Sequence, residues 1–256
     1  MPRDTVSKTL IVAALLCIVC SVLVSSAAVI LRPTQAVNKL NDKKRNILMA
    51  AGLVDESKSI DELFGSIEAR VVDLASGEYV DDINAEEFDQ RAAAKESVTS
   101  VAIPASEDRA GIKRRSKLAA VYLVQKKGAV DKVILPVHDK GLWSTLYGFL
   151  ALDRKDLNTI RSLVFYEHAE TPGLGGEVEN PQWKSLWNGK LAFAPSGDVS
   201  IEVLRGKVDL SKAQAIHQVD GLSGATITAR GVSEMLRYWL SDSGFRPYLN
   251  RLQKEG

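Results

Sequence analysis

One short segment of this 256-residue chain has the residue types and spacing to hold an anionic cofactor. It reads Asp220-Gly-Leu-Ser-Gly-Ala-Thr226-Ile-Thr228. Gly221 and Gly224 permit a tight turn in which backbone amides can approach an anion, and a helical apolar repeat follows. A phosphate at the start of that helix would meet unpaired N–H groups and the positive end of the helix dipole. The residues alone leave a second interpretation open, a Ser/Thr-rich helix cap without chemistry.

This segment resembles the flavin-attachment motif of FMN-binding domains, Asp-x-x-Ser/Thr-Gly-Ala-Thr. The resemblance implies that a flavin transferase links FMN covalently, through its phosphate, to Thr226. It also implies that Asp220, Ser223, Gly224 and Ala225 belong to the cofactor-binding loop.

The helix after the motif needs a start signal of its own. Because Thr228 directly precedes Ala229 and the apolar repeat, we expect the helix to begin near these two residues with Thr228 as its cap. Thr226 is then expected in the approach loop, where an enzyme can reach its hydroxyl. Lys207 and Lys212 lie near enough in sequence to assist a phosphate, or else are solvated surface lysines.

Two further stretches extend the resemblance over most of the chain. They read Gly141-Leu-Trp-Ser-Thr-Leu-Tyr-Gly-Phe-Leu150 and His168-Ala-Glu-Thr-Pro-Gly-Leu-Gly-Gly-Glu177, and Asn-Pro-Gln-Trp follows shortly after. Together with one apolar anchor and the chain length, they resemble the C subunits of the sodium-translocating NADH:quinone reductases. The G subunit of the Rnf electron-transport complex shares the Thr-Pro-Gly-Leu-Gly and Ser-Gly-Ala-Thr elements and is the near alternative.

These stretches supply the remaining predicted cofactor contacts, which are Trp143, Glu170, Thr171, Leu174 and Gly175. The Pro/Gly loop at residues 171–176 can approach a planar ring closely, and Leu174 can cover one ring face. Trp143 is either an aromatic contact or a core tryptophan. His168 beside Glu170 could form a general-base cluster, but we interpret it as a strand-end histidine with solvated neighbours and no catalytic role.

The resemblance implies a one-electron carrier within a larger enzyme. FMN would accept an electron from a neighbouring carrier and pass it on, while other membrane subunits oxidise NADH, reduce ubiquinone and move sodium. The protein's part is then to position and tune the flavin, so no complete active site is expected in this chain. The implied location is the bacterial inner membrane, with the large domain in the periplasm.

Other chemistries find little support. The three histidines are dispersed without metal-binding spacing, so no metal site is expected. No complete dinucleotide or nucleotide phosphate loop occurs, so neither an NADH nor an ATP site is expected. A net charge of +1 offers no surface for nucleic acid. A non-redox, membrane-anchored binding module is the rival interpretation from another functional class.

The clearest structural element in the sequence is a membrane anchor before these segments. Residues 9–31 contain no charged side chain, and as a helix they span the ~30 Å hydrocarbon core of a bilayer. A signal peptide is the alternative, although its apolar core is typically about 7–15 residues. Cys17 and Cys20 lie inside this run and are expected to pack rather than bind metal.

Charge gives a conflicting orientation. Arg3 and Lys8 precede the run and five basic residues follow it by position 45, so the positive-inside rule alone would keep the domain in the cytoplasm. That rule is weak for long translocated domains, and the resemblance points to the periplasm.

The remaining pattern predicts an α+β fold, with a single N-terminal transmembrane helix followed by one extracytoplasmic FMN-binding domain. We expect three segments: a tail and anchor (residues 1–36), a stalk helix and peripheral segment (37–116), and the FMN-binding domain (117–256). An amphipathic helix is expected at 37–53, either as a separate element or as a stalk that continues the membrane helix. Loops are expected over 55–117, with a helix-like piece at 60–72. Apolar runs predict strands at 118–124, 130–137, 145–152, 159–168 and 199–205. Helices are predicted at 182–187, around Val232 to Leu240, and at 245–252.

Overall fold

The computed structural model describes residues 5–55 and 57–255 and consists of two compact units, divided between Lys44 and Arg45. Helix α1 (Val6–Ala51) begins in the first unit and ends in the second. The anchor expected at 9–31 and the amphipathic helix expected at 37–53 are therefore one continuous helix. Cys17 and Cys20 are exposed free thiols on it, and Pro33 lies in its interior. Arg3 lies outside the described residues.

Among the described residues, α1 is the one helix long and apolar enough to cross a membrane. Its large apolar side chains before residue 32 are all exposed in the isolated chain, as a lipid-facing surface requires. A single-pass membrane protein with a mixed α/β domain fits these observations.

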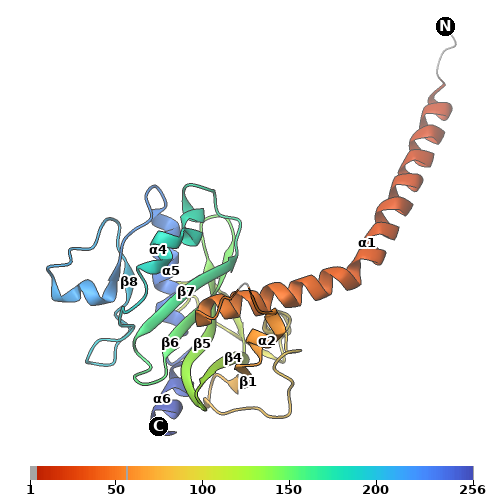
Figure 1. Ribbon diagram of the computed structural model, residues 1–256. Coiled ribbons are helices and arrows are strands. Elements are labelled where there is room, and N and C mark those ends of the chain that lie inside the picture. The colour runs from red at the N-terminus through yellow and green to blue at the C-terminus, as the bar shows by residue number, and fades with distance from the viewer. Residues whose placement is uncertain (1–4, 56, 256) are drawn as a thin grey trace. The chain divides into compact units, whose positions relative to one another are not determined.

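The second unit is built on a five-stranded antiparallel sheet, with spatial order β1-β4-β5-β6-β7 (Figure 1). Its strands are β1 (Ile67–Asp73), β4 (Leu118–Lys126), β5 (Ala129–Lys140), β6 (Thr145–Asp153) and β7 (Ile160–Glu167). The four strands predicted between residues 118 and 168 are confirmed as β4 to β7. They read as continuous apolar runs because both faces of the sheet are covered.

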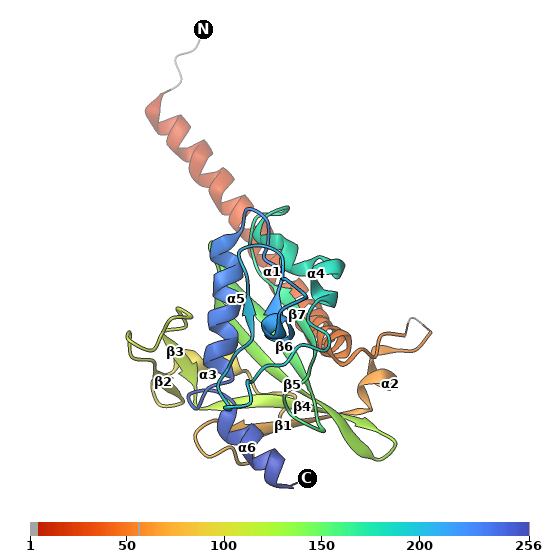
Figure 2. The ribbon, with the colours of Figure 1, turned by 90° about the vertical axis from the view of Figure 1, so that its left-hand side faces the viewer.

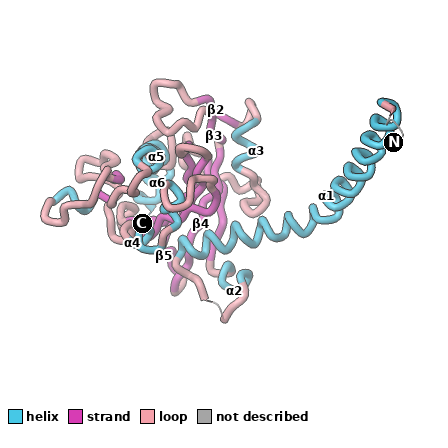
Figure 3. Tube along the Cα trace, turned by 90° about the horizontal axis from the view of Figure 1, so that it is seen from above, coloured by secondary structure: helices cyan, strands magenta, loops and turns pink. Residues whose placement is uncertain are grey.

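Alternate residues of each strand enter two different cores. In β4, Val121 and Leu123 enter the first core while Tyr122 and Val124 enter the second. The first core lies between the sheet and helices α5 (Thr226–Trp239) and α6 (Arg246–Glu255). Figure 2 shows α5 lying against this face, and Figure 3 shows α5 and α6 on one side of the strands.

The last turns of α1 cover the opposite face. Ile47 and Leu48 are buried in the second core together with Phe149 of β6. The sheet also binds the helix end, because Lys132 Nζ donates to Ala51 O at 2.6 Å and Ser162 Oγ donates to Ala50 O at 2.6 Å. These bonds satisfy carbonyls that a helix C-terminus leaves unpaired.

Shorter elements complete the unit. They are helices α2 (Ile60–Phe64), α3 (Gln90–Lys95) and α4 (Pro181–Ser185), 3₁₀ helices η1 (Gly175–Glu179) and η2 (Ala213–His217), and strands β2 (Ser100–Ala102), β3 (Arg114–Ser116), β8 (Glu202–Val203) and β9 (Gln218–Val219). The helices predicted at 182–187 and 245–252 correspond to α4 and α6.

Several sequence expectations about the elements are wrong. The helix-like piece at 60–72 is α2, which stops after one turn at Gly65, followed by β1, which pairs along its length with β4. Residues 55–117 are therefore not only loops and peripheral structure. The strand expected at 199–205 is reduced to Glu202–Val203, which pairs in parallel with β9. The boundaries at 36/37 and 116/117 stay predictions.

A further correction concerns the helix after the motif. It begins at Thr226, two residues before the expected start. Ala225 holds the N-cap position, and Thr228 lies inside the first turn. Thr228 is therefore not a cap, and Thr226 is the first helical residue rather than part of a loop.

Candidate functional site

The hydroxyl of Thr226 is exposed at the N-terminus of α5. Ala225 provides no side-chain cap for this helix. The N–H of Ala229 donates to Ala225 O at 2.9 Å. Within the described part of the chain, the three preceding N–H groups at residues 226–228 have no acceptor, and the Thr226 hydroxyl has no partner. These groups can all approach an anion from solvent.

The carboxylate of Glu170 brings the three sequence stretches together. Its Oε1 accepts the N–H groups of Trp143 at 2.9 Å and Ser144 at 3.2 Å. Its Oε2 accepts the Oγ1–H of Thr228 at 2.8 Å. Ser144 Oγ also accepts the N–H of Ala169 at 2.7 Å, so three hydrogen bonds join the first two stretches. Glu170 is only 5% exposed and Thr228 only 1%.

Two glycines make the space that this carboxylate occupies. A Cβ on Gly141 would lie 2.5 Å from Glu170 Oε1. A Cβ on Gly175 would lie 2.6 Å from Glu170 Oε2 and 2.7 Å from Thr228 Oγ1. Real Cβ atoms do not approach other atoms so closely, so a side chain at either position would displace the Glu170 carboxylate. We call Glu170, Thr228, Gly141 and Gly175 the carboxylate box.

Glu170 is ionised in this setting. Burial by itself raises the pKa of its carboxyl, but the hydrogen bonds from the Trp143 N–H, the Thr228 hydroxyl and the Ser144 N–H outweigh it and lower that pKa. The sequence predicts that the neighbours of His168 are solvated. This prediction is wrong for Glu170, which is buried. His168 itself directly follows β7, accepts the Glu170 N–H on Nδ1 at 3.2 Å, and lies with Nε2 3.1 Å from Glu179 Oε1.

Three large apolar side chains are exposed on the segments that the Glu170 carboxylate joins. Trp143 is 70% exposed, so the alternative of a core tryptophan is wrong. Leu174 is 44% exposed and touches the motif loop, since a Cβ on Gly224 would lie 2.7 Å from Leu174 Cδ2. Ile227 is 49% exposed directly after Thr226. Trp143, Leu174 and Ile227 form what we call the apolar rim.

The other predicted residues shape the loops. Asp220 accepts the Val208 N–H on Oδ1 at 2.8 Å, and its carbonyl accepts Trp183 Nε1–H at 2.8 Å, so it fixes the base of the motif loop. The carbonyl of Thr171 accepts the N–H groups of Leu174 at 3.1 Å and Gly176 at 3.0 Å, which closes the Pro/Gly loop. Ser223 and Gly224 are exposed and Ala225 is buried.

The two candidate lysines differ in their surroundings. Lys212 lies 3.6 Å from Asp209, with both side chains mostly solvated. Lys207 is exposed. Neither position indicates a phosphate contact.

Sequence reasoning missed Gly141, Ile227 and the bond between Thr228 and Glu170. The one sequence signal for Thr228 is its position two residues after Thr226, and a threonine at that position fits a helix cap equally well. Its partner lies 58 residues earlier in the chain, and spacing does not reveal such a contact.

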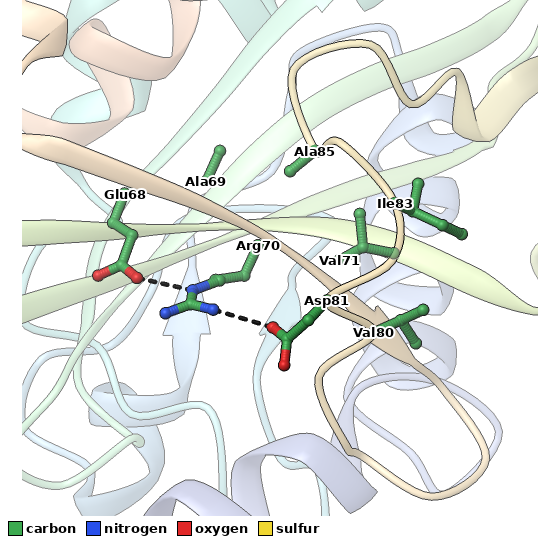
Figure 4. Close-up of a pocket in the computed structure, with 8 residues that line it drawn as sticks. All are labelled: Glu68, Ala69, Arg70, Val71, Val80, Asp81, Ile83 and Ala85. Atoms are coloured by element: carbon green, nitrogen blue, oxygen red, sulfur yellow. Dashed lines mark hydrogen bonds and ion pairs between the residues drawn. The ribbon is translucent and has the colours of Figure 1, made fainter.

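A separate cavity of about 330 Å³ lies along the outer edge of β1 (Figure 4). Arg70 in its wall already pairs with Glu68 at 2.6 Å and Asp81 at 3.0 Å, so its charge is balanced within the wall. None of the predicted site residues lines this cavity. No group of metal-ligating side chains occurs among residues 5–55 and 57–255.

Comparisons with known proteins place the three stretches within one family domain. The FMN-binding domain family matches residues 141–241, which include the carboxylate box and the apolar rim. The C subunit of the Na⁺-translocating NADH-quinone reductase of Pseudomonas aeruginosa is 50% identical over 98% of both chains. Its Haemophilus ducreyi counterpart is 45% identical over 98% of this chain and 96% of its own. The crystal structure of Shewanella oneidensis NqrC superposes with a TM-score of 0.78 at 36% identity, covering 85% of this chain and 99% of that one. The chain therefore belongs to the family of the C subunits of the Na⁺-translocating NADH-quinone reductases.

Proposed function

We propose that this chain carries FMN as a phosphoester on Thr226 and serves as a one-electron carrier in a membrane sodium-pumping NADH:quinone reductase. The observation that supports it best is the N-terminus of α5, where an exposed hydroxyl without a partner stands beside N–H groups without acceptors among the described residues. A phosphate esterified to that hydroxyl meets those N–H groups and the positive end of the helix dipole. Ester formation joins FMN to the side chain with the net loss of one water.

The apolar rim fits a planar aromatic ring. Leu174 lies against Gly224 of the motif loop, Trp143 is exposed on a segment bonded to Glu170, and exposed large apolar side chains that gather together mark ligand or partner surfaces. The glycines of the 171–176 loop allow its backbone to approach a ring. Thr171 and Gly175 are therefore proposed to shape the ring site. Glu170 uses both oxygens inside the protein, so its proposed role toward FMN is indirect.

The flavin supplies the redox chemistry when it is bound, and this chain binds, orients and partly shields it. We propose no general acid, general base or NADH site in the chain. The proposed partners are the other membrane subunits and a flavin transferase that attaches FMN. The large domain is proposed to face the periplasm, since the transferase step is proposed to follow export.

Mapping of the flavin tests the proposal. The full-length protein, co-produced with the transferase, is digested, and the peptides are sequenced by mass spectrometry. We expect one FMN, less one water, on Thr226, and a fluorescent band that survives denaturing electrophoresis. Thr226→Ala should abolish the band, whereas Ser223→Thr, which keeps a hydroxyl at the Ser/Thr position of the motif, should keep it. Label on Ser223 or Thr228 would contradict the assignment, and no covalent flavin would favour the binding-module alternative.

The near alternative, the G subunit of an Rnf complex, is distinguished by the intact assembly. We expect the protein to purify with reductase subunits whose activity depends on quinone and sodium. The 50% identity to a reductase subunit over nearly the whole chain already favours the reductase.

A further inference from the structure

The carboxylate box is a built polar site that a simple helix cap would not need. Glu170 is a buried, ionised side chain with three hydrogen bonds, and these bonds join three segments far apart in sequence. A buried carboxylate is unfavourable unless such bonds compensate it. An apolar side chain at this position would leave the N–H groups of Trp143 and Ser144 and the hydroxyl of Thr228 without their acceptor, so the carboxylate holds these groups in one fixed arrangement.

What the box places is the first turn of α5. Thr228 lies two residues after Thr226, so a bond from its hydroxyl to Glu170 fixes the rotation and depth of that turn. Because the same carboxylate holds the N–H of Trp143, the attachment residue and one side of the apolar rim are fixed to a single point. Gly175 packs against both side chains. A Cβ at this position would displace Glu170 and Thr228, so the glycine leaves room for the bond between them.

We propose that Glu170 and Thr228 are positioning residues that present the Thr226 hydroxyl to the flavin transferase and hold it beside the apolar rim. This inference rests on the proposed attachment at Thr226. It gives Thr228, two residues after the motif, the role of a hydrogen-bond donor to the buried carboxylate, which is separate from both capping and flavin attachment.

The test compares the rate of flavin attachment with the stability of the fold. Detergent-solubilised full-length protein is incubated with the transferase and its flavin nucleotide donor, and covalent flavin is followed as in-gel fluorescence. Thr228→Val keeps the shape of the side chain but loses the donor, and it should slow attachment about tenfold. Thr228→Ser restores the donor and should recover the rate to within about twofold.

Ser233→Ala is the matched control. Ser233 is another buried hydroxyl of α5, which accepts the Val203 N–H at 2.8 Å and makes no contact with the box. Its loss should lower the unfolding temperature while leaving the attachment rate unchanged. An equal slowing in Ser233→Ala and Thr228→Val would overturn the proposal, because stability alone would then explain both.

The remaining outcomes are also decisive. If the Thr228→Val variant receives FMN at the wild-type rate, the positioning role is overturned, while the proposal that Thr226 is the attachment residue still stands. Absence of label from Thr226 in the wild-type peptide map would instead refute the proposed function. If Thr228→Val does not accumulate, Thr228→Ala replaces it, since it also removes the donor to Glu170 and should slow attachment likewise. Wild-type attachment in Thr228→Ala would overturn the proposal.

Discussion

The Trp143 side chain lies mostly in solvent, and under the proposed function it shields the flavin. Because its side chain is mostly exposed, Trp143→Ala should change the free energy of unfolding by less than about 0.5 kcal/mol. Covalent FMN should be retained, since only the backbone N–H of Trp143 enters the carboxylate box. The ring should become more accessible, which iodide quenching of flavin fluorescence measures. Leu210→Ala, at another exposed apolar residue, is the control, and equal quenching in both variants would argue against the rim.

Asp139 is a buried carboxyl in β5 that affects stability rather than chemistry. One oxygen accepts the Lys140 N–H, and the other has no partner within the described residues. That second oxygen faces α5, 3.1 Å from where a Cβ on Gly231 would lie. Burial, with smaller contributions from Asp108 and Glu234, raises the pKa of Asp139 to about 8 against the opposing Lys140 N–H. The folded protein therefore holds this proton at neutral pH.

The sign of the pH effect follows from that proton. The unfolded chain loses it near the ordinary aspartate pKa of 3.8 and the folded chain only near 8, so stability falls as pH rises through this window. The slope approaches about 1.4 kcal/mol per pH unit. Asp139→Asn should remove this slope, and the difference between variant and wild type in urea unfolding at pH 5, 7 and 9 measures it. Asp209→Asn, at an exposed carboxyl, should keep the slope; a wild-type slope in Asp139→Asn would contradict the prediction.

At the scale of elements, α5 lacks a side-chain cap, and attached FMN should supply one. A phosphate at a helix N-terminus typically contributes about 0.3–1 kcal/mol. Peptides covering residues 220–230 should therefore exchange their amide hydrogens more slowly in the flavinylated protein than in the same protein made without the transferase. Peptides of α6 serve as the internal control. Identical exchange in the motif peptide would show that the phosphate lies away from the helix end.

Local pattern was sufficient for the central strands but not for the first one. The runs at 118–124, 130–137, 145–152 and 159–168 are long, apolar and separated by turn residues, and each became a strand. β1 is not predicted from the sequence, because its residues follow a helix start at Ser59. Only their pairing with β4, some fifty residues later in the chain, makes them a strand. Gly65, where α2 ends, was the signal that could have separated the two elements.

The site shows the same limit. Motif resemblance selected residues from all three stretches, and the structure brings those stretches together. The role of Glu170 could not be predicted, because its partners lie 26 to 58 residues away and its charge resembled that of a solvated loop. Thr228 looked like a cap because a cap and a buried hydrogen-bond donor have the same residue type.

At the scale of the whole molecule, the side of the membrane that the domain occupies can be tested directly. Residues 9–31 should stay in the mature chain, with everything after residue 55 in the periplasm. Protease added to intact spheroplasts should then cut the domain, as it cuts a known outer-face protein used as control. A protected domain would mean that the basic residues after the anchor decide the orientation, as the positive-inside rule has it. A mature N-terminus near residue 28 would indicate a cleaved signal peptide.

The last turns of α1 belong to the domain. Two truncated chains that differ by nine residues, one with these turns and one without them, should therefore differ in stability. A chain of residues 45–256 keeps Ile47 and Leu48 in the second core and keeps the carbonyls that Lys132 and Ser162 bind. Made in the cytoplasm, it should fold and stay colourless, because the proposed transferase acts after export. A chain of residues 54–256 uncovers the face of the sheet that includes Phe149.

Burial of each such large side chain contributes about 1.5–3 kcal/mol, so the shorter chain should lose roughly 3–6 kcal/mol from Ile47 and Leu48 alone. That loss is a large part of the ~5–15 kcal/mol available to a typical domain. Thermal unfolding followed by circular dichroism measures the difference. Equal unfolding temperatures for the two chains would show that α1 ends outside the core, and covalent flavin on the cytoplasmic 45–256 chain would show that attachment does not require export.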